Sequence, residues 1–174
     1  SAASDVYKRQ VILCMIFGGG SWKTPINNVM DVLNDGDGKA YEELMPPYYK
    51  DMADALDGII DISDEDFDEE AENQRDRLTK KYGDDAEISY EVVKKTKVDS
   101  DDIDSYNEVS DVASILSSKK AKKYKLTKAY KVKIKYTIEG EDADKTDKTT
   151  VIVGKMDGTW VLLDEGDLPI STGF

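Results

Sequence analysis

The spacing of apolar residues divides the chain into a helical first half and a stranded second half. From Thr24 onward, apolar residues recur every three to four positions and so predict amphipathic helices. Thr24 offers a side-chain oxygen to the free amides of the first helix, and Pro25 has the φ angle that suits a first turn. The turn-rich run 34–38 and the pair Pro46-Pro47 separate the elements that follow. The predicted helices begin at Thr24 and end before residue 34, and then span 39–45, 48–56 and 63–82, the last being mostly polar with Phe67, Ala71 and Leu78 inward.

In the second half, apolar and polar residues alternate, which is typical of strands with one buried face. Ile88, Tyr90 and Val92 form the first apolar row, and the row from Tyr130 to Ile138 is the clearest in the chain. Two further strands, 149–154 and 159–163, are joined around Asp157-Gly158, a strong hairpin signal. An inserted helix is predicted at 102–116, with Ile103, Val109, Ala113 and Leu116 inward. Helices followed by antiparallel strands indicate an α+β fold, in which N-terminal helices pack on a curved antiparallel sheet of about four strands.

Two phrases of the sequence resemble a known family. The opening TPINNVMDVLNDGDGKAYEELMPPYY and the closing DGTWVLLDE, with a polar helix and a strand meander between them, look like the nuclear transport factor two-like (cystatin-like) fold. The resemblance covers roughly residues 25–165 and points to the small extracytoplasmic bacterial members of that family. It implies a cone, formed by a curved sheet around helices, with a pocket at its wide end. No catalytic motif of the family matches this sequence residue by residue, so the resemblance implies a fold and no catalytic residue.

Composition removes several classes of function. The 174 residues are 39% hydrophobic and 35% charged, which leaves enough apolar side chains for one packed domain. A formal net charge of -13 disfavours nucleic acid and anionic lipid over most of the surface. The lack of histidine removes the commonest general base and the usual zinc ligand, and the single cysteine, Cys14, cannot form an internal disulfide. We therefore expect no metal, no cofactor and no nucleic-acid partner.

The first 22 residues differ in composition from the rest. Residues 1–10 resemble a translated sequencing adapter and are interpreted as a non-native leader. Residues 11–22 begin with the apolar run VILCMIF and a run of glycines, which favour the remnant of a signal peptide or membrane anchor plus a linker; a short buried strand is the alternative. The domain is expected at 23–166, with a tail at 167–174. An anchor implies an extracytoplasmic location, either membrane-tethered or secreted.

Two charged segments could bind ions or partners. Residues 31–42 partly follow a calcium loop, but Leu33 occupies a ligand position, so we expect a helix connection and no calcium requirement. Residues 119–135 contain nine lysines and no acid. They form either a basic patch for an anionic partner or, as we favour, a solvated outer sheet face that Glu87 and Glu91 oppose from a neighbouring strand. A row of lysines also disfavours association through the sheet and so favours a monomer.

Aromatic residues supply the candidate binding site. Tyr48, Tyr90, Tyr136 and Trp160 are all placed inward and are predicted to form the aromatic wall of a small cavity; close-packed core is the alternative. The leading hypothesis is a non-catalytic module of the bacterial cell envelope that binds a small molecule or an envelope protein, with membrane contact only through the missing anchor. The alternatives are a cryptic enzyme, marked by a carboxylate of raised pKa beside a tyrosine, and a structural spacer or dimerisation domain.

Overall fold

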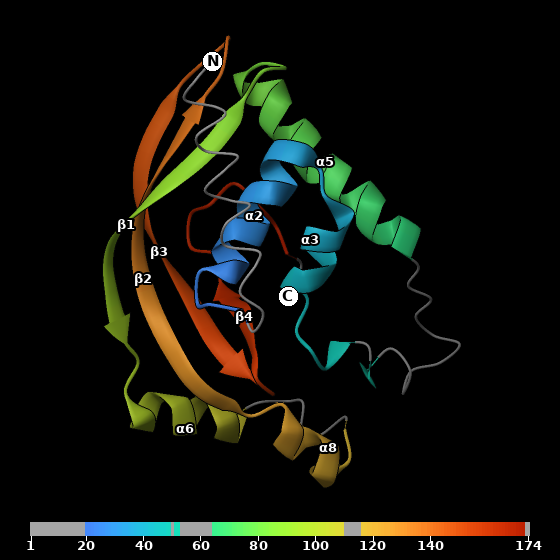
Figure 1. Cartoon of the computed structure of the whole chain (residues 1–174), viewed down its shortest axis with the longest axis vertical. Helices are drawn as coiled ribbons and strands as arrows, with labels where there is room; N and C mark the ends of the chain where they lie inside the picture. Colours follow the sequence, from blue (N-terminus) through green and yellow to red (C-terminus); the bar gives the residue numbers. More distant parts are fainter. Residues whose placement is uncertain (1–19, 50, 53–63, 110–115, 173–174) are drawn as a thin grey trace.

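The computed structural model describes residues 20–49, 51–52, 64–109 and 116–172. The helices are α2 (Thr24–Asp35), α3 (Gly38–Leu44), α5 (Asp64–Tyr82), α6 (Ser100–Val109) and α8 (Ser118–Lys123). The strands are β1 (Glu87–Lys97), β2 (Leu126–Glu139), β3 (Lys145–Met156) and β4 (Thr159–Asp164), as labelled in Figure 1. The predicted leader, the apolar run of the predicted anchor and most of the predicted helix 48–56 lie outside the described residues.

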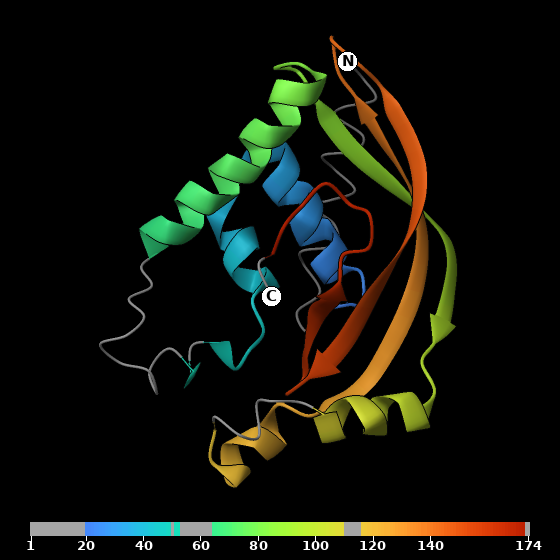
Figure 2. The same cartoon turned by 180° about the vertical axis from the view of Figure 1, so that it is seen from behind.

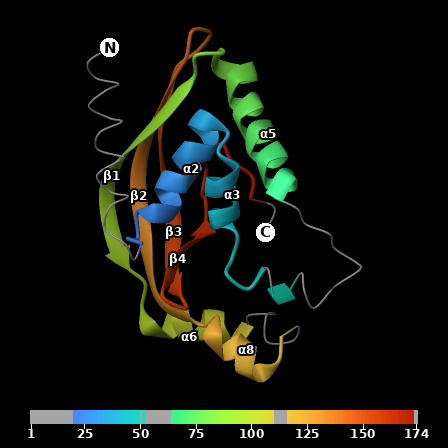
Figure 3. The ribbon, with the colours of Figure 1, turned by 45° about the vertical axis from the view of Figure 1, so that its right-hand side comes forward.

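The four strands form one antiparallel sheet in the order β1-β2-β3-β4. Helices α2, α3 and α5 pack against one another on one face of this sheet, with α2 in contact with β1 and β4. Figure 2 shows from behind how the sheet bends around these helices, and Figure 3 shows α6 and α8 together at one end. Helices gathered on one face of an antiparallel sheet confirm the predicted α+β fold.

The main core lies between α2, α5 and the concave side of the sheet. Helix α2 is buried along most of its length, and it ends at Gly36, whose φ of 64° is the left-handed conformation that glycine adopts readily. Helix α5 is mostly polar and contributes only one stripe of side chains to the main core. The stripe contains the predicted Phe67, Ala71 and Leu78 and also Gln74 and Tyr82, which the sequence pattern did not single out.

A smaller apolar cluster lies on the opposite face of the sheet at one end. Neighbouring residues of a strand point to opposite faces, and Trp160 packs on the main core while Val161 belongs to the smaller cluster. We call this the end cluster; its buried members are Val98, Ile103, Leu126, Ala129, Met156 and Val161. Ile103 comes from α6, so α6 covers the sheet from this second side.

The inserted helix is confirmed in part. Helix α6 begins at Ser100, two positions before the predicted start, and Ile103 and Leu116 are buried as expected. The side chains of Val109 and Ala113 lie outside the described ones. Helix α8 was not predicted, because its SKKAKK sequence has no apolar periodicity.

The strands follow the predicted alternation with one error. On β2, Val132, Ile134, Tyr136 and Ile138 are all fully buried. On β1, Ile88 is buried as predicted, whereas Val92 is 37% exposed because the register shifts between Val92 and Lys94. The predicted hairpin is confirmed, with positive φ at both Asp157 (48°) and Gly158 (79°), as in a type I′ turn.

Two asparagines link helices to strands through both the nitrogen and the oxygen of their side-chain amides. Asn34, near the end of α2, donates to the carbonyl of Ile88 at 3.0 Å and accepts from its backbone N–H at 2.8 Å. Asn107 of α6 makes the same pair with Leu126, at 2.9 Å in both directions. Each asparagine amide therefore pairs with the backbone of one strand residue as a neighbouring strand would, and this holds the helix against the sheet at that residue.

Gln74 fastens the C-terminal segment in the same way. It is 1% exposed, donates to the carbonyl of Ser171 at 3.2 Å and accepts from its N–H at 3.1 Å. Leu168 and Ile170 are buried in the main core. Residues 167–172 are therefore part of the packed domain, in contrast to the tail expected from the sequence.

Candidate functional site: an aromatic and lysine cluster

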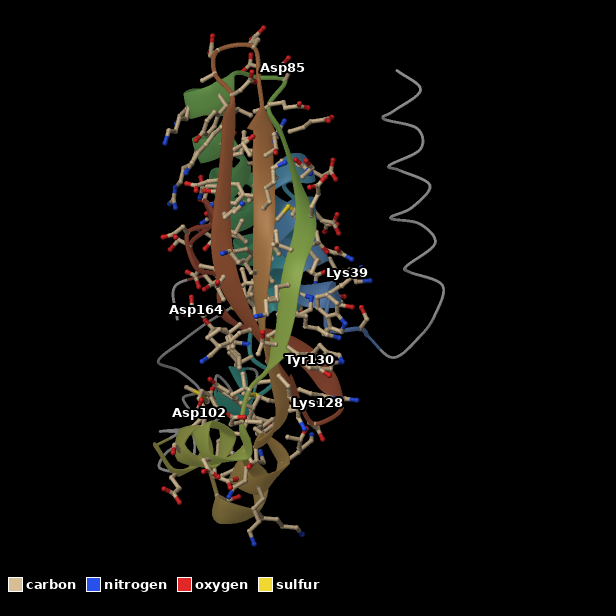
Figure 4. All side chains as sticks on the ribbon, turned by 90° about the vertical axis from the view of Figure 1, so that its left-hand side faces the viewer. Lys39, Asp85, Asp102, Lys128, Tyr130 and Asp164 are labelled. Carbon is tan, nitrogen blue, oxygen red and sulfur yellow. The ribbon has the colours of Figure 1, made fainter. Side chains whose placement is uncertain are left out.

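Three half-buried aromatic rings meet beside two lysines near the start of α2. Tyr130 stacks on Trp160, with ring centroids 5.5 Å apart and planes inclined by 15°. Trp22 meets Tyr130 edge-on, with centroids 6.4 Å apart. Lys95 and Lys128 lie over the Tyr130 ring. We call these five residues the aromatic–lysine cluster. Figure 4 shows Lys128 and Tyr130 on the same stretch of the sheet.

Trp22 is held in place by the turn that precedes α2. The N–H of Ser21 donates to the hydroxyl of Thr24 at 3.0 Å, and the N–H of Lys23 donates to the hydroxyl of Ser21 at 3.2 Å. The N-cap position belongs to Lys23, and the Thr24 oxygen bonds a residue upstream of the helix, so the predicted capping role of Thr24 is wrong. These bonds order the chain at Trp22.

The other two rings are positioned by the sheet. Tyr130 pairs with Lys97 of β1 on one side and with Val153 of β3 on the other, and its side chain belongs to the inward row. Trp160 follows the type I′ turn and pairs with Lys155. The stack is therefore built between β2 and β4, which lie on either side of β3.

The ammonium groups of Lys95 and Lys128 lie close to the faces of these rings. The Lys95 ammonium lies 4.8 Å from the Trp22 centroid and 4.6 Å from that of Tyr130, and the Lys128 ammonium lies 5.3 Å from Tyr130. Such cation–π contacts are attractive. Hydrogen bonding by Lys128, with the nearby charges of Lys128, Lys95 and Lys97, lowers the pKa of the Tyr130 hydroxyl below its ordinary value.

These ammonium groups carry unneutralised charge. Among the residues that the structure describes, the salt bridges are made by other lysines, namely Lys120, Lys123, Lys135 and Lys145. Within the same described part of the chain, Lys95 and Lys128 contact rings and form no ion pair with a carboxylate. The arrangement can therefore hold an anionic group beside a flat apolar surface.

The four residues predicted to line a cavity occupy different places. Trp160 lies in the aromatic–lysine cluster. Tyr90 and Tyr136 face each other across β1 and β2; Tyr90 donates to the side chain of Asn27 at 2.7 Å, and Tyr136 is fully buried. Tyr48 packs on the end cluster and meets Tyr124 edge-on at 6.0 Å. The structure thus places three of them along the main core and Tyr48 on the end cluster.

The fully buried ring of Tyr136 has a polar end. Its hydroxyl donates to the carbonyl of Asp167 at 3.3 Å and accepts from the Lys145 ammonium at 2.8 Å. This bond raises the pKa of Lys145 above its ordinary value. The hydroxyl is therefore satisfied by protein groups, as is usual for a buried tyrosine.

Sequence reasoning missed two of the three rings of the cluster and both of its lysines. Trp22 fell within the expected linker, and Tyr130 was interpreted only as part of the inward row. A signal was present at Lys128, which holds a position that should be apolar if the inward row of its predicted strand continued. Lys95 and Lys97 reach the same face only through the register shift after Val92.

The carboxylates of the calcium-like segment lie between α2 and α3. Burial raises the pKa of Asp31 to about 6, helped by the nearby charges of Asp35, Asp37 and Glu43. Asp37 accepts from the N–H of Ala40 at 3.1 Å and so caps α3. Within the described ranges, no group of three or more acidic or cysteine side chains is placed to hold a metal ion.

Comparison of the chain with protein-family models, with curated proteins and with solved structures finds no match. In the part of the chain that the structure describes, no helix has both the length and the apolar character to cross a membrane.

Proposed function

We propose that this chain is a non-catalytic binding module of the bacterial cell envelope, built on a nuclear transport factor two-like fold, and that its ligand contacts the aromatic–lysine cluster. The observation that carries the proposal is the contact of Lys95 with both Trp22 and Tyr130, in a cluster whose lysines have no carboxylate partner among the described residues.

The chemistry of the cluster indicates the kind of ligand. Stacked aromatic rings offer flat apolar surface, which suits a sugar ring or a planar group. Free ammonium groups beside them favour a carboxylate or phosphate. A small anionic building block of the envelope, either free or displayed on an envelope protein, combines both features.

Tryptophan fluorescence tests the proposal directly. The chain contains two tryptophans, Trp22 and Trp160, and both lie in the cluster. We expect N-acetylmuramic acid, N-acetylglutamate or glycerol 3-phosphate to change the emission saturably, with a Kd below about 1 mM, which corresponds to a binding free energy of about -4 kcal/mol.

Two variants locate the binding. Lys95→Gln should abolish the change because it removes the charge that lies over both rings. Lys119→Gln is the matched control, since Lys119 is an exposed lysine of α8 that lies over none of the three rings of the cluster in the described structure. If none of the three compounds changes the emission saturably, or if both variants behave alike, the proposal is wrong.

A further inference from the structure

The outer face of the sheet carries a compact group of lysines. The inward row of β2 is buried, so the alternate positions of this strand and their cross-strand partners point outward. Those positions lie on the convex side, away from α2, α3 and α5, on the side that Figure 4 views. We call them the lysine face: Lys94 of β1, Lys131, Lys133 and Lys135 of β2, and Lys148 of β3.

The lysine face places like charges directly opposite one another. Lys133 pairs with Lys94 on one side, and Lys135 pairs with Lys148 on the other. Like charges at opposed positions of an antiparallel pair destabilise a sheet. Glu91 offsets part of this repulsion, because its carboxylate lies 3.8 Å from the Lys135 ammonium. Both side chains of that ion pair are well exposed, so its contribution is small.

The neutralisation expected from the sequence is therefore only half present. Glu91 opposes Lys135 as predicted, whereas Glu87 pairs with Glu139 and faces no lysine. The outward positions of β1, β2 and β3 hold five lysines, and their three glutamates are Glu91, beside Lys135, and the Glu87–Glu139 pair at one end, in a chain whose net charge is -13. Positive charge is thus concentrated on three neighbouring strands at a cost in stability. A sheet that needed only a solvated outer face could mix both signs of charge along its whole length, whereas here two of the three glutamates pair with each other at one end.

The spacing of the lysines fits a linear polyanion. Lys131, Lys133 and Lys135 alternate along β2, so their side chains leave the sheet about 6.6 to 6.8 Å apart. Phosphodiester polymers carry a charge on every repeat, and the phosphate charges of nucleic acids supply most of their sequence-independent binding to proteins. Thr96 and Thr150, on the strands to either side, add hydroxyl donors beside the lysines.

Two features distinguish the kind of polymer. Within the described strands β1–β3, the outward positions above the end cluster hold no aromatic ring; they are Glu87, Ser89, Glu91, Lys94, Thr96, Lys131, Lys133, Lys135, Thr137, Glu139, Thr146, Lys148, Thr150 and Ile152. Single-stranded nucleic acids are held by stacking of bases on aromatic side chains, which this surface does not offer. The face is also convex, so a flat lipid surface would meet only part of it, whereas a flexible chain can follow it (Figure 1).

We propose that the lysine face is a docking surface for a linear, base-free phosphodiester polymer of the polyol-phosphate type, which lies along β2. This surface is separate from the aromatic–lysine cluster, because Lys131 and Tyr130 are neighbours on one strand and point to opposite faces. The inference therefore goes beyond the proposed function and does not depend on it.

Binding of soluble poly(glycerol phosphate) to the full chain tests the proposal. We expect binding at about 20 mM salt that weakens steadily as salt is raised. The variant Lys131→Gln, Lys133→Gln, Lys135→Gln should bind at least about tenfold more weakly, and the slope of log affinity against log salt should become shallower by about 2, since each phosphate contact contributes about 0.7 for a single strand.

A second triple variant controls for net charge. Lys119→Gln, Lys122→Gln and Lys125→Gln remove the same charge from exposed positions of α8 and of the short connection between α8 and β2, and they should change the affinity less than twofold. The β2 variant should melt no earlier than the wild type at about 0.15 M salt, because it removes repulsive pairs. Circular dichroism at about 20 mM salt should show it folded at the temperature of the binding measurement, so its loss of binding cannot be assigned to unfolding.

Four outcomes would overturn the inference. They are the absence of binding to poly(glycerol phosphate) at low salt, equal losses in the two triple variants, equal or tighter binding of an oligothymidylate, and binding to phosphatidylglycerol vesicles without binding to the soluble polymer. The third would indicate a nucleic-acid surface and the fourth a lipid surface. The Lys95→Gln variant should bind the polymer as the wild type does, which keeps this test separate from that of the aromatic–lysine cluster.

Discussion

The negative charge of Asp31 is disfavoured both by burial and by neighbouring carboxylates. It is half-buried on α2 with three carboxylates nearby, and its pKa rises from 3.8 to about 6. A pKa that is higher in the folded than in the unfolded state means that the folded protein holds the proton more tightly. The free energy of unfolding therefore decreases as the pH rises between about 4 and 6, and the cost of the Asp31 charge is fully present above that range.

We predict that Asp31→Asn stabilises the protein at neutral pH. The amide keeps the shape of the side chain and removes a charge that burial and Asp35, Asp37 and Glu43 oppose. The melting temperature of the variant should exceed that of the wild type at about pH 7.5, and the two should converge at about pH 4, where the wild-type carboxyl is largely protonated. A difference that is the same at both pH values would contradict this account.

Trp160 tests whether the aromatic–lysine cluster is surface or core. A fully buried aromatic side chain costs about 3 to 5 kcal/mol when it is truncated to alanine. Trp160 is half-buried and stacked on one ring, so we predict that Trp160→Ala lowers the free energy of unfolding by about 1 to 2 kcal/mol, mostly through lost apolar area and stacking. Urea unfolding followed by circular dichroism measures this. A loss above about 3 kcal/mol would place Trp160 in closed core and remove the platform of the proposed ligand site.

Elements with a strong internal period could be predicted from the sequence, and most contacts between elements, apart from that of Glu91 with Lys135, could not. The stripe of α2, the alternation of β2 and the turn at Asp157-Gly158 are all local signals, and all three are confirmed. The bond of Asn34 to Ile88 joins residues 54 positions apart, and no local pattern marks it. Trp22 was missed for the same reason, since its ring partner Tyr130 lies on a distant strand.

Gly140 marks a close approach between two elements. A Cβ at this position would lie 2.1 Å from the carbonyl oxygen of Tyr82, at the end of α5, so the turn between β2 and β3 fits only without a side chain. We predict that Gly140→Ala lowers the free energy of unfolding by more than about 2 kcal/mol, because the backbone must move apart.

Gly158→Ala is the matched control for Gly140→Ala. Gly158 has a φ of 79°, and a Cβ added there would meet no atom within 4 Å. The substitution should therefore lower the free energy of unfolding only by the strain of a left-handed alanine, about 1 to 2 kcal/mol. Thermal or urea unfolding of the two variants gives the comparison. Equal losses would mean that conformation, and not the contact with α5, sets the cost at Gly140.

At the scale of the whole molecule, charge is divided between two layers. The first part of α5, residues 64–76, holds eight carboxylates and one arginine, and it lies in the helical layer. The lysine face lies on the other side of the sheet. The net charge of -13 therefore hides a positive surface, whereas composition by itself disfavoured nucleic acid and anionic lipid over most of the surface.

This division predicts how salt changes stability. Raising sodium chloride from about 0.01 to 0.15 M shortens the Debye length from about 30 to 8 Å, which screens the long-range repulsion of an excess of acids. The exposed ion pairs contribute about 0 to 1 kcal/mol each, so their loss is smaller than this gain. We expect the melting temperature of the wild type to rise with salt, measured by calorimetry. The β2 triple variant is three charges more negative, so its melting temperature should rise more steeply with salt. At about 0.15 M salt only repulsion between neighbouring lysines still acts, and there the variant should melt no earlier than the wild type. A melting temperature that falls with salt, or a shallower rise in the variant, would show that local ion pairs and not the overall acidic excess govern the stability of this fold.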